Sequence, residues 1–170
     1  MKINLRSYRF IVLFLAGMLA IFYNQTVEGF PIIFGIAVTI SAGLSVIYLF
    51  LQFDKPINEK VVMEIIADGF SGIVLFTYPQ SNEWFFLIVF SFWIVWMGIL
   101  CLTSGMLDKK HAKLMWLYTL LGIMLIVFGF VIINYNSEMI NTVTYLVGFI
   151  LSIYSAFGLY IGLFRKSEIY

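Results

Sequence analysis

The sequence has few of the residues with which soluble enzymes do chemistry. It contains one cysteine, Cys101, and one histidine, His111, and only 11% of its 170 residues are charged. A single thiol excludes an intrachain disulfide, and one histidine with one cysteine is too few for a metal site of ordinary spacing. The sequence also lacks a glycine-rich phosphate loop, a serine nucleophile elbow and a dinucleotide fingerprint. We therefore expect no enzymatic activity, no metal and no cofactor.

Hydrophobic residues dominate instead, at 62% of the sequence, compared with roughly 45–50% in soluble domains. They form six runs, at about residues 9–23, 31–52, 60–78, 84–103, 113–133 and 139–164. Most of these runs are close to the ~20 residues that a helix needs to cross a bilayer. They lack the strict alternation of barrel strands, so they predict transmembrane helices. The lipid bilayer is the expected partner, and nucleic acid is not, because the basic residues form no single face.

A short signature occurs three times and sets the expected architecture. It consists of Gly, five residues, Tyr, then Asn or Pro, then Gln or Ser. The tyrosines stand at positions 23, 78 and 135, which gives offsets of 55 and 57, and a small residue follows each tyrosine by twenty positions, at Gly43, Gly98 and Ser155. The three copies contain Gly17, Tyr23, Asn24 and Gln25; Gly72, Tyr78, Pro79 and Gln80; and Gly129, Tyr135, Asn136 and Ser137.

Features that recur at nearly one period indicate one unit used three times. We predict an all-α fold, a bundle of six transmembrane helices built from three helical hairpins. The repeats cover approximately residues 8–53, 58–106 and 112–164 of a single membrane domain. Because every hairpin starts on the same side of the membrane, the three repeats are parallel.

The basic residues predict the orientation. All ten lysines and arginines lie before the first run or at its start, between the second and third or the fourth and fifth runs or at the start of the later one, or after the sixth. The three other turns carry only acidic charges, namely Glu28, Glu83 and Glu138. By the positive-inside rule both termini are cytoplasmic. Arg9, at the start of the short first run, is expected to extend its side chain to the headgroups.

Two acidic residues inside the third run, Glu64 and Asp68, form the candidate intramembrane site. A spacing of four places both on one helical face, and a charge near the bilayer centre costs on the order of 2.5–3.5 kcal/mol, so it usually has a function. In one interpretation burial and mutual repulsion favour the protonated forms, and the pair takes up or relays a proton. In the other, Asp68 is protonated or bonds polar side chains of the second run, such as Ser41, while Glu64 reaches water beside Lys60. Both interpretations remain open at this stage.

Small residues predict how the helices pack. In lipid, close approach of backbones at Gly, Ala and Ser stabilises helix contacts. Such residues form stripes at Ala16 and Ala20, at Gly122 and Gly129, and at Gly148, Ser152 and Ser155. We expect these stripes to make contacts within the bundle, and they would also allow a homo-oligomer.

The segments Ala67–Pro79 and Leu121–Phe130 resemble the short repeat of HdeD-type bacterial membrane proteins. The resemblance covers essentially the whole chain, with three hairpins where that family has three. It implies an inner-membrane protein associated with acid resistance, and it supplies no catalytic residues. An alternative from another class is a small proton-coupled transporter or channel that uses Glu64 and Asp68.

The topology can be tested by labelling introduced cysteines. Single cysteines at Gln25→Cys, Gln80→Cys and Ser137→Cys are expected to react with a membrane-impermeant reagent added to intact cells. A cysteine at His111→Cys should not react, because the basic turns lie inside. If only His111→Cys were labelled, the true orientation would be the reverse of the predicted one.

Overall fold

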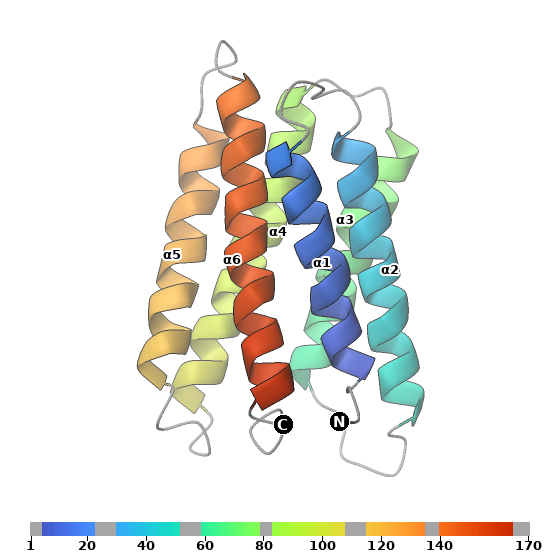
Figure 1. Cartoon of the computed structure of the whole chain (residues 1–170), viewed down its shortest axis with the longest axis vertical. Coiled ribbons are helices and arrows are strands. Elements are labelled where there is room, and N and C mark those ends of the chain that lie inside the picture. Colours follow the sequence, from blue (N-terminus) through green and yellow to red (C-terminus); the bar gives the residue numbers. More distant parts are fainter. Residues whose placement is uncertain are drawn as a thin grey trace.

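The fold consists of six helices that run side by side (Figure 1). This computed structural model describes residues 5–22, 30–51, 59–78, 83–107, 115–134 and 140–164. The helices are α1 (Leu5–Phe22), α2 (Phe30–Leu51), α3 (Glu59–Thr77), α4 (Glu83–Leu107), α5 (Met115–Ile133) and α6 (Ile140–Phe164). Helices α1, α3 and α5 begin at the end of the bundle where α2, α4 and α6 finish (Figure 1). The predicted all-α bundle of three parallel hairpins is confirmed.

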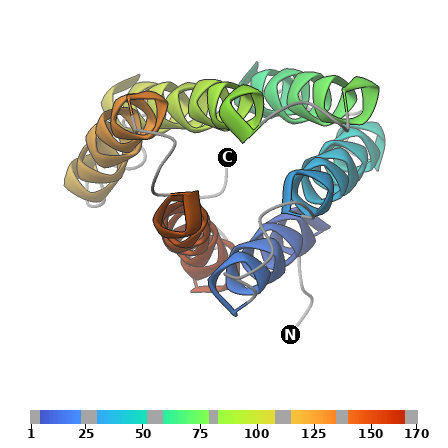
Figure 2. The same cartoon turned by 90° about the horizontal axis from the view of Figure 1, so that it is seen from above.

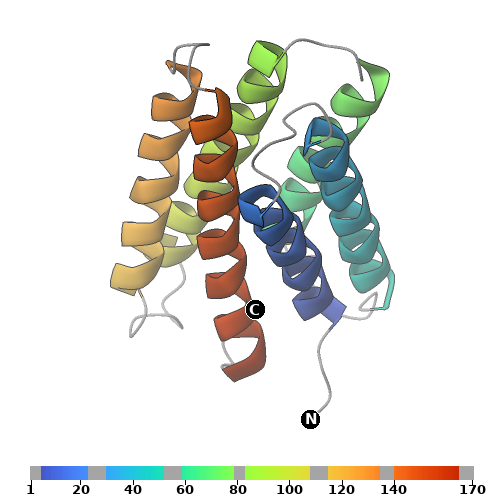
Figure 3. The same ribbon diagram turned by 45° about the horizontal axis from the view of Figure 1, so that its top comes forward.

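The helices form a ring in the order α1, α2, α3, α4, α5, α6 (Figure 2). The most extensive contacts join α4 to α5, α1 to α6, and α2 to α3. Each of these pairs joins the second helix of one repeat to the first helix of the next, and the α6–α1 pair closes the circle. Figure 3 shows α6 between α5 and α1, but its contact with α5 is the sparsest of the ring. The hairpins are therefore the units of sequence, and contacts between consecutive repeats provide most of the packing.

The glycine of each repeat signature lies at one of these contacts between repeats. A Cβ added at Gly17 would be 2.9 Å from the carbonyl oxygen of Gly148 on α6. The corresponding distance is 3.5 Å from Gly72 to the carbonyl of Gly35 on α2, and 3.2 Å from Gly129 to that of Ser91 on α4. The partner positions 35, 91 and 148 follow nearly the same period, at offsets of 56 and 57. The same backbone approach thus occurs three times around the ring.

The repeat spacing predicts that Gly43 is equivalent to Gly98 and Ser155, and this prediction is wrong. Gly43 is exposed, and nothing lies within 4 Å of a Cβ placed there, whereas Gly98 and Ser155 are buried. Ala42 is buried and corresponds to Gly98 at an offset of 56. The first helices of repeats one and two correspond at an offset of 55, but their second helices correspond at 56. A slip of one position turns a helical side chain by about 100°, which moves Gly43 to the outer face.

The outer surface of the bundle is apolar and the interior carries the charge, which is the reverse of a soluble protein. Exposed side chains include Leu15, Phe50, Ile73, Ile123 and Phe130. Four segments are long and apolar enough to cross a membrane: Phe30–Leu51, Trp84–Met106, Met115–Ile133 and Thr144–Leu163. Helices α1 and α3 carry the buried charges, and both lie alongside these four (Figure 1). The chain is a multi-pass membrane protein.

The turn signatures lie largely outside the described residues, and Tyr23, Pro79 and Tyr135 are among the residues that are not described. Tyr78 is described: it follows α3 and is 59% exposed, in edge contact with Phe85. An exposed tyrosine at a helix end fits the headgroup position expected of it. A common height of the three tyrosines remains a prediction.

Replacing Gly98 by Ala should destabilise the protein, and replacing Gly43 by Ala should not. A Cβ at Gly98 would lie 2.9 Å from the carbonyl oxygen of Gly122 and 3.2 Å from the backbone nitrogen of Ile126. These are backbone atoms, so α4 and α5 must separate, which typically costs about 1–3 kcal/mol. Thermal unfolding of the purified variants in one detergent measures the difference. Equal midpoints for both variants would contradict the close contact of α4 and α5.

Candidate functional site

The candidate site occupies corresponding positions of the three repeats. Arg9, Glu64 and Leu121 are related by the offsets 55 and 57, and so are Leu13, Asp68 and Leu125. All six positions are buried, with exposed fractions of 5% or less. Repeat one places Arg9, and repeat two places Glu64 and Asp68, at positions where the third repeat has leucine. The charges meet in the interior because the repeats direct the same helical face inward.

Glu64 is held by two arginines of α1. The Arg6 Nη2 donates to Oε1 and Oε2 of Glu64 at 3.0 and 2.8 Å. The Arg9 Nη1 lies 2.8 Å from Oε2 of the same carboxylate. The side chains of Arg6 and Glu64 are 4% and 2% exposed, and Arg9 is completely buried. Both ions of each pair are thus removed from water.

Asp68 lies one helical turn further into the bundle and accepts donors from three helices. The Arg9 guanidinium donates through Nε at 3.1 Å and through Nη2 at 3.4 Å. The Ser41 hydroxyl of α2 donates at 2.5 Å and the Trp93 indole of α4 at 2.7 Å. The side chain of Asp68 is completely buried. Four donors satisfy both carboxylate oxygens, as burial of an ionised group requires.

The second helices enclose Arg9 with three residues at corresponding positions, Ser41, Met97 and Tyr154. The Ser41 Oγ accepts from Arg9 Nε at 2.8 Å, and Met97 Sδ lies 3.8 Å from Nη2. The Tyr154 hydroxyl donates to the same sulfur at 3.4 Å. All three repeats therefore contribute to the surroundings of one guanidinium, which lies inside the ring.

The structure brings Glu64 and Asp68 together through Arg9, and it changes two expectations. The contact of Ser41 with Asp68 is confirmed. Glu64 does not reach water beside Lys60, and Arg9 does not extend to the headgroups, because each is buried against a counter-charge. A guanidinium beside both carboxylates also removes the simple repulsion expected between two isolated acids. Whether the pair titrates stays a prediction.

Sequence reasoning missed Arg6, Arg9 and Trp93 as partners of the acids. Arg9 and Glu64 are separated by an offset of 55, the same as that of the first two signatures. Corresponding positions of neighbouring repeats face one interior, so this offset could have revealed the ion pair. Trp93 offered no comparable signal, because Ala37 and Ile150 occupy its corresponding positions.

The cluster of Arg6, Arg9, Glu64 and Asp68 has no net charge when all four groups are ionised. Such a buried network is weak evidence of stability by itself, because desolvation offsets the attraction between the charges. Removing a single partner is a different matter, since it leaves an uncompensated charge in an apolar interior. Among the described residues, no group of three or more His, Cys, Asp and Glu could hold a metal ion.

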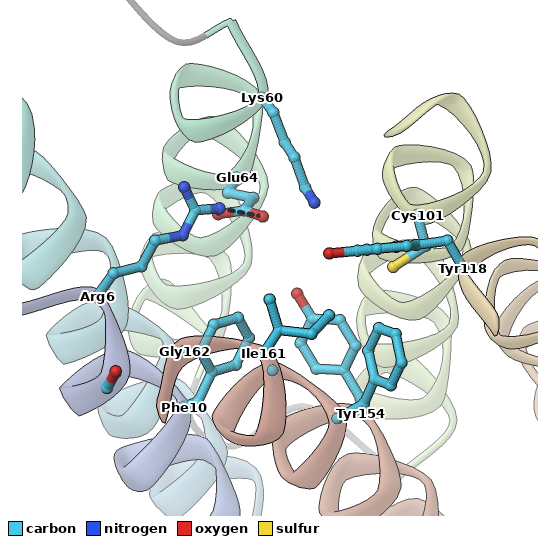
Figure 4. Close-up of a pocket in the computed structure, with 12 residues that line it drawn as sticks. Arg6, Phe10, Lys60, Glu64, Cys101, Tyr118, Tyr154, Ile161 and Gly162 are labelled. Atoms are coloured by element: carbon cyan, nitrogen blue, oxygen red, sulfur yellow. Dashed lines mark hydrogen bonds and ion pairs between the residues drawn. The ribbon is translucent and has the colours of Figure 1, made fainter. Parts of the chain in front are cut away.

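A cavity of about 30 Å³ adjoins the cluster at the end of the bundle where α1 begins (Figure 4). Arg6 and Glu64 form part of its wall, together with residues of α1, α3, α4, α5 and α6. The full lining is Arg6, Ser7, Phe10, Lys60, Glu64, Cys101, Tyr118, Tyr154, Phe157, Gly158, Ile161 and Gly162. Asp68 does not line it, so the two carboxylates have different surroundings.

The repeat that organises this site also identifies the family. The short repeat of unknown function (DUF308) matches residues 66–134 and 120–169. The chain belongs to the DUF308 short-repeat family. The two matches cover residues 66–169, which is more than half of the chain, and they begin within α3 and α5, the first helices of repeats two and three. No curated protein and no solved structure matches this chain.

The DUF308 repeat is the domain of HdeD-type membrane proteins, so the resemblance is confirmed at the level of the repeat. Helices α1 and α2 lie outside the matched residues, although they have the same burial pattern as the other repeats at the offsets given above. The structure therefore shows a further hairpin of similar packing, α1 with α2, and it supplies Arg6 and Arg9.

Replacement of Arg9 by Leu should destabilise the protein strongly, by about 3–5 kcal/mol, because Asp68 and Glu64 lose a buried counter-charge. The matched control combines Arg6→Val, Arg9→Leu, Glu64→Leu and Asp68→Leu. Each charged residue is thereby replaced by the apolar residue that another repeat has at the corresponding position. The fourfold variant should unfold at a higher denaturant concentration than Arg9→Leu alone. Equilibrium unfolding in mixed micelles measures both, and the opposite order would contradict the pairing described here.

Proposed function

We propose that this DUF308 protein is a non-enzymatic, HdeD-type protein of the bacterial inner membrane that acts in acid or envelope stress resistance. Both termini face the cytoplasm in this proposal. The repeat supports the relation to HdeD-type proteins, and the basic ends of α1 and α3 support the orientation. The homo-oligomer remains part of the proposal, although the stripes at Gly122, Gly129 and Gly148 already make contacts within the bundle.

The state of the two carboxylates supports a non-catalytic role most directly. A catalytic acid or base must approach the atom with which it exchanges a proton, within about 2.6–3.2 Å or through one water. Both oxygens of Asp68 are instead occupied by donors from Arg9, Ser41 and Trp93, in a completely buried position. The oxygens of Glu64 are occupied by Arg6 and Arg9. The cluster holds helices α1, α2, α3 and α4 together.

The alternative, a proton-coupled transporter or channel, draws support from one observation. Glu64 lines the cavity at the end of the bundle, while Asp68 lies deeper on the same helical face. Two carboxylates at successive depths resemble the first steps of a proton relay. The Trp93 indole and the Ser41 hydroxyl close the path at Asp68, and we therefore favour the non-transporting role.

One set of variants separates the two functions. Deletion of the gene in the source bacterium should lower survival after acid challenge about tenfold or more, and the parent gene should restore it. The fourfold apolar variant should restore survival as well, because the proposed role needs the folded bundle and not its titratable groups. Proteoliposomes containing the parent protein should show no more proton flux than protein-free liposomes.

Two results would contradict the proposed function. Proton flux in the parent that disappears in Asp68→Asn would establish the transporter and remove the proposed role. Unchanged survival after deletion, under acid and under envelope stress, would remove the stress function. Immunoblotting of membranes shows that each variant is present in comparable amounts.

A further inference from the structure

Helix α3 carries four charged residues, Glu59, Lys60, Glu64 and Asp68. Among the described residues, it is not one of the segments that are long and apolar enough to cross a membrane by themselves. Asp68 is the middle residue of the 19 in α3, so neither end of the helix brings its carboxylate close to water. An acidic residue at the centre of a membrane helix is among the costliest to insert. Helix α3 therefore needs partners in order to occupy its place in the bundle.

The counter-charges that meet the two buried acids of α3 come from α1. The Arg9 guanidinium donates to Asp68 at 3.1 and 3.4 Å and lies 2.8 Å from Glu64. Arg6 extends from α1 to Glu64, at 2.8 Å, as Figure 4 shows. Because α1 precedes α3 in the chain, it is synthesised first. Both arginines are therefore available at the membrane when α3 enters it.

The two helices differ in how far their charges lie from water before they meet. Arg6 and Arg9 are the second and fifth residues of α1, and a long arginine side chain near a helix end can extend to the headgroups. Asp68 is nine residues from either end of α3, which is about 14 Å at a rise of 1.5 Å per residue. Its short side chain cannot span that distance. Helix α1 can therefore cross the membrane without α3, whereas α3 depends on α1.

We propose that α1 guides the insertion of α3, so that the topology of the chain beyond α2 depends on the two arginines of α1. Helices α1 and α3 begin at the same end of the bundle (Figure 1), so the arginines and the acids enter from one side of the membrane. Arg6 and Arg9 remain at the headgroups until α3 arrives, and pairing with Glu64 and Asp68 then moves them into the interior. This role concerns the orientation of the later helices, and it is independent of the proposed stress function.

Cysteine labelling with a membrane-impermeant reagent in intact cells measures the topology, in a background that carries Cys101→Ala. The reporters are Gln80→Cys, between α3 and α4, and His111→Cys, between α4 and α5. In the parent only one reporter should react, because α4 separates the two segments. In the double variant Arg6→Val/Arg9→Leu, labelling of the protected reporter should rise about threefold or more, because α4 crosses in the opposite direction in chains whose α3 fails to insert.

Three control variants separate charge pairing from other effects of the arginines. The variant that combines Arg6→Val, Arg9→Leu, Glu64→Leu and Asp68→Leu lacks the same two positive charges, but its α3 has no buried acid, so it should keep the labelling pattern of the parent. Glu64→Leu/Asp68→Leu should also keep it, because the arginines of α1 can extend to the headgroups. Arg6→Lys/Arg9→Lys retains both positive charges and should keep it as well.

An unchanged labelling pattern in Arg6→Val/Arg9→Leu would overturn the proposal, because a bundle that is only destabilised keeps the orientation of each inserted helix. An equal change in the fourfold variant would overturn it too, since the loss of positive charge near the N-terminus would then explain the result. If the double variant does not accumulate in cells, full-length chains translated in vitro into membrane vesicles provide the same labelling measurement, with the same two outcomes.

Discussion

The guanidinium of Arg9 is the group on which the interior of this protein depends. It lies between Glu64 and Asp68 without exposure to solvent, and residues from all three repeats surround it. A charge of this kind in an apolar interior is tolerated only if its partners are fixed in position. The ion pairs connect α1 to α3, and the contacts with Ser41 and Trp93 connect these helices to α2 and α4. The first two repeats are thereby held in one arrangement.

The close approach of helices around the ring complements this central network. In a bilayer the apolar outer faces gain nothing from contact with one another, because lipid is equally apolar. Small residues at Gly17, Gly72 and Gly129 allow the backbones to approach instead. Charge pairing in the first two repeats and small-residue contacts between all three therefore serve the same purpose at different places. The third repeat has leucine in place of the charges and relies on packing.

Much of the fold could be predicted from the sequence, because its signals are local. Long apolar runs predict helices, and the signature at Gly17, Gly72 and Gly129 predicts three copies of one hairpin. Which helices make the most extensive contacts could not be predicted in the same way. Adjacency in sequence favours contact between the two helices of one hairpin, whereas the most extensive contacts join helices of different repeats. Gly43 shows the limit of pattern matching, because a shift of one position in the period places it on the outer face. At the site, Glu64 and Asp68 are conspicuous because they are acidic residues in an apolar run. Arg9 resembles an ordinary charge at the end of a helix, and only its separation from Glu64 in the sequence, which equals the repeat period, indicates that the two residues correspond.

The contact between α6 and α1 fixes how many repeats this ring contains. It has the same form as the contacts of α2 with α3 and of α4 with α5, with Gly17 against the backbone of Gly148. The first helix of the chain thus meets the last as if it were the next repeat. A fourth hairpin would have to displace α1 from α6, and a chain of two would leave both faces without a neighbour. Three is the number at which this ring of repeats closes on itself, in contrast to open solenoids that can be lengthened one unit at a time.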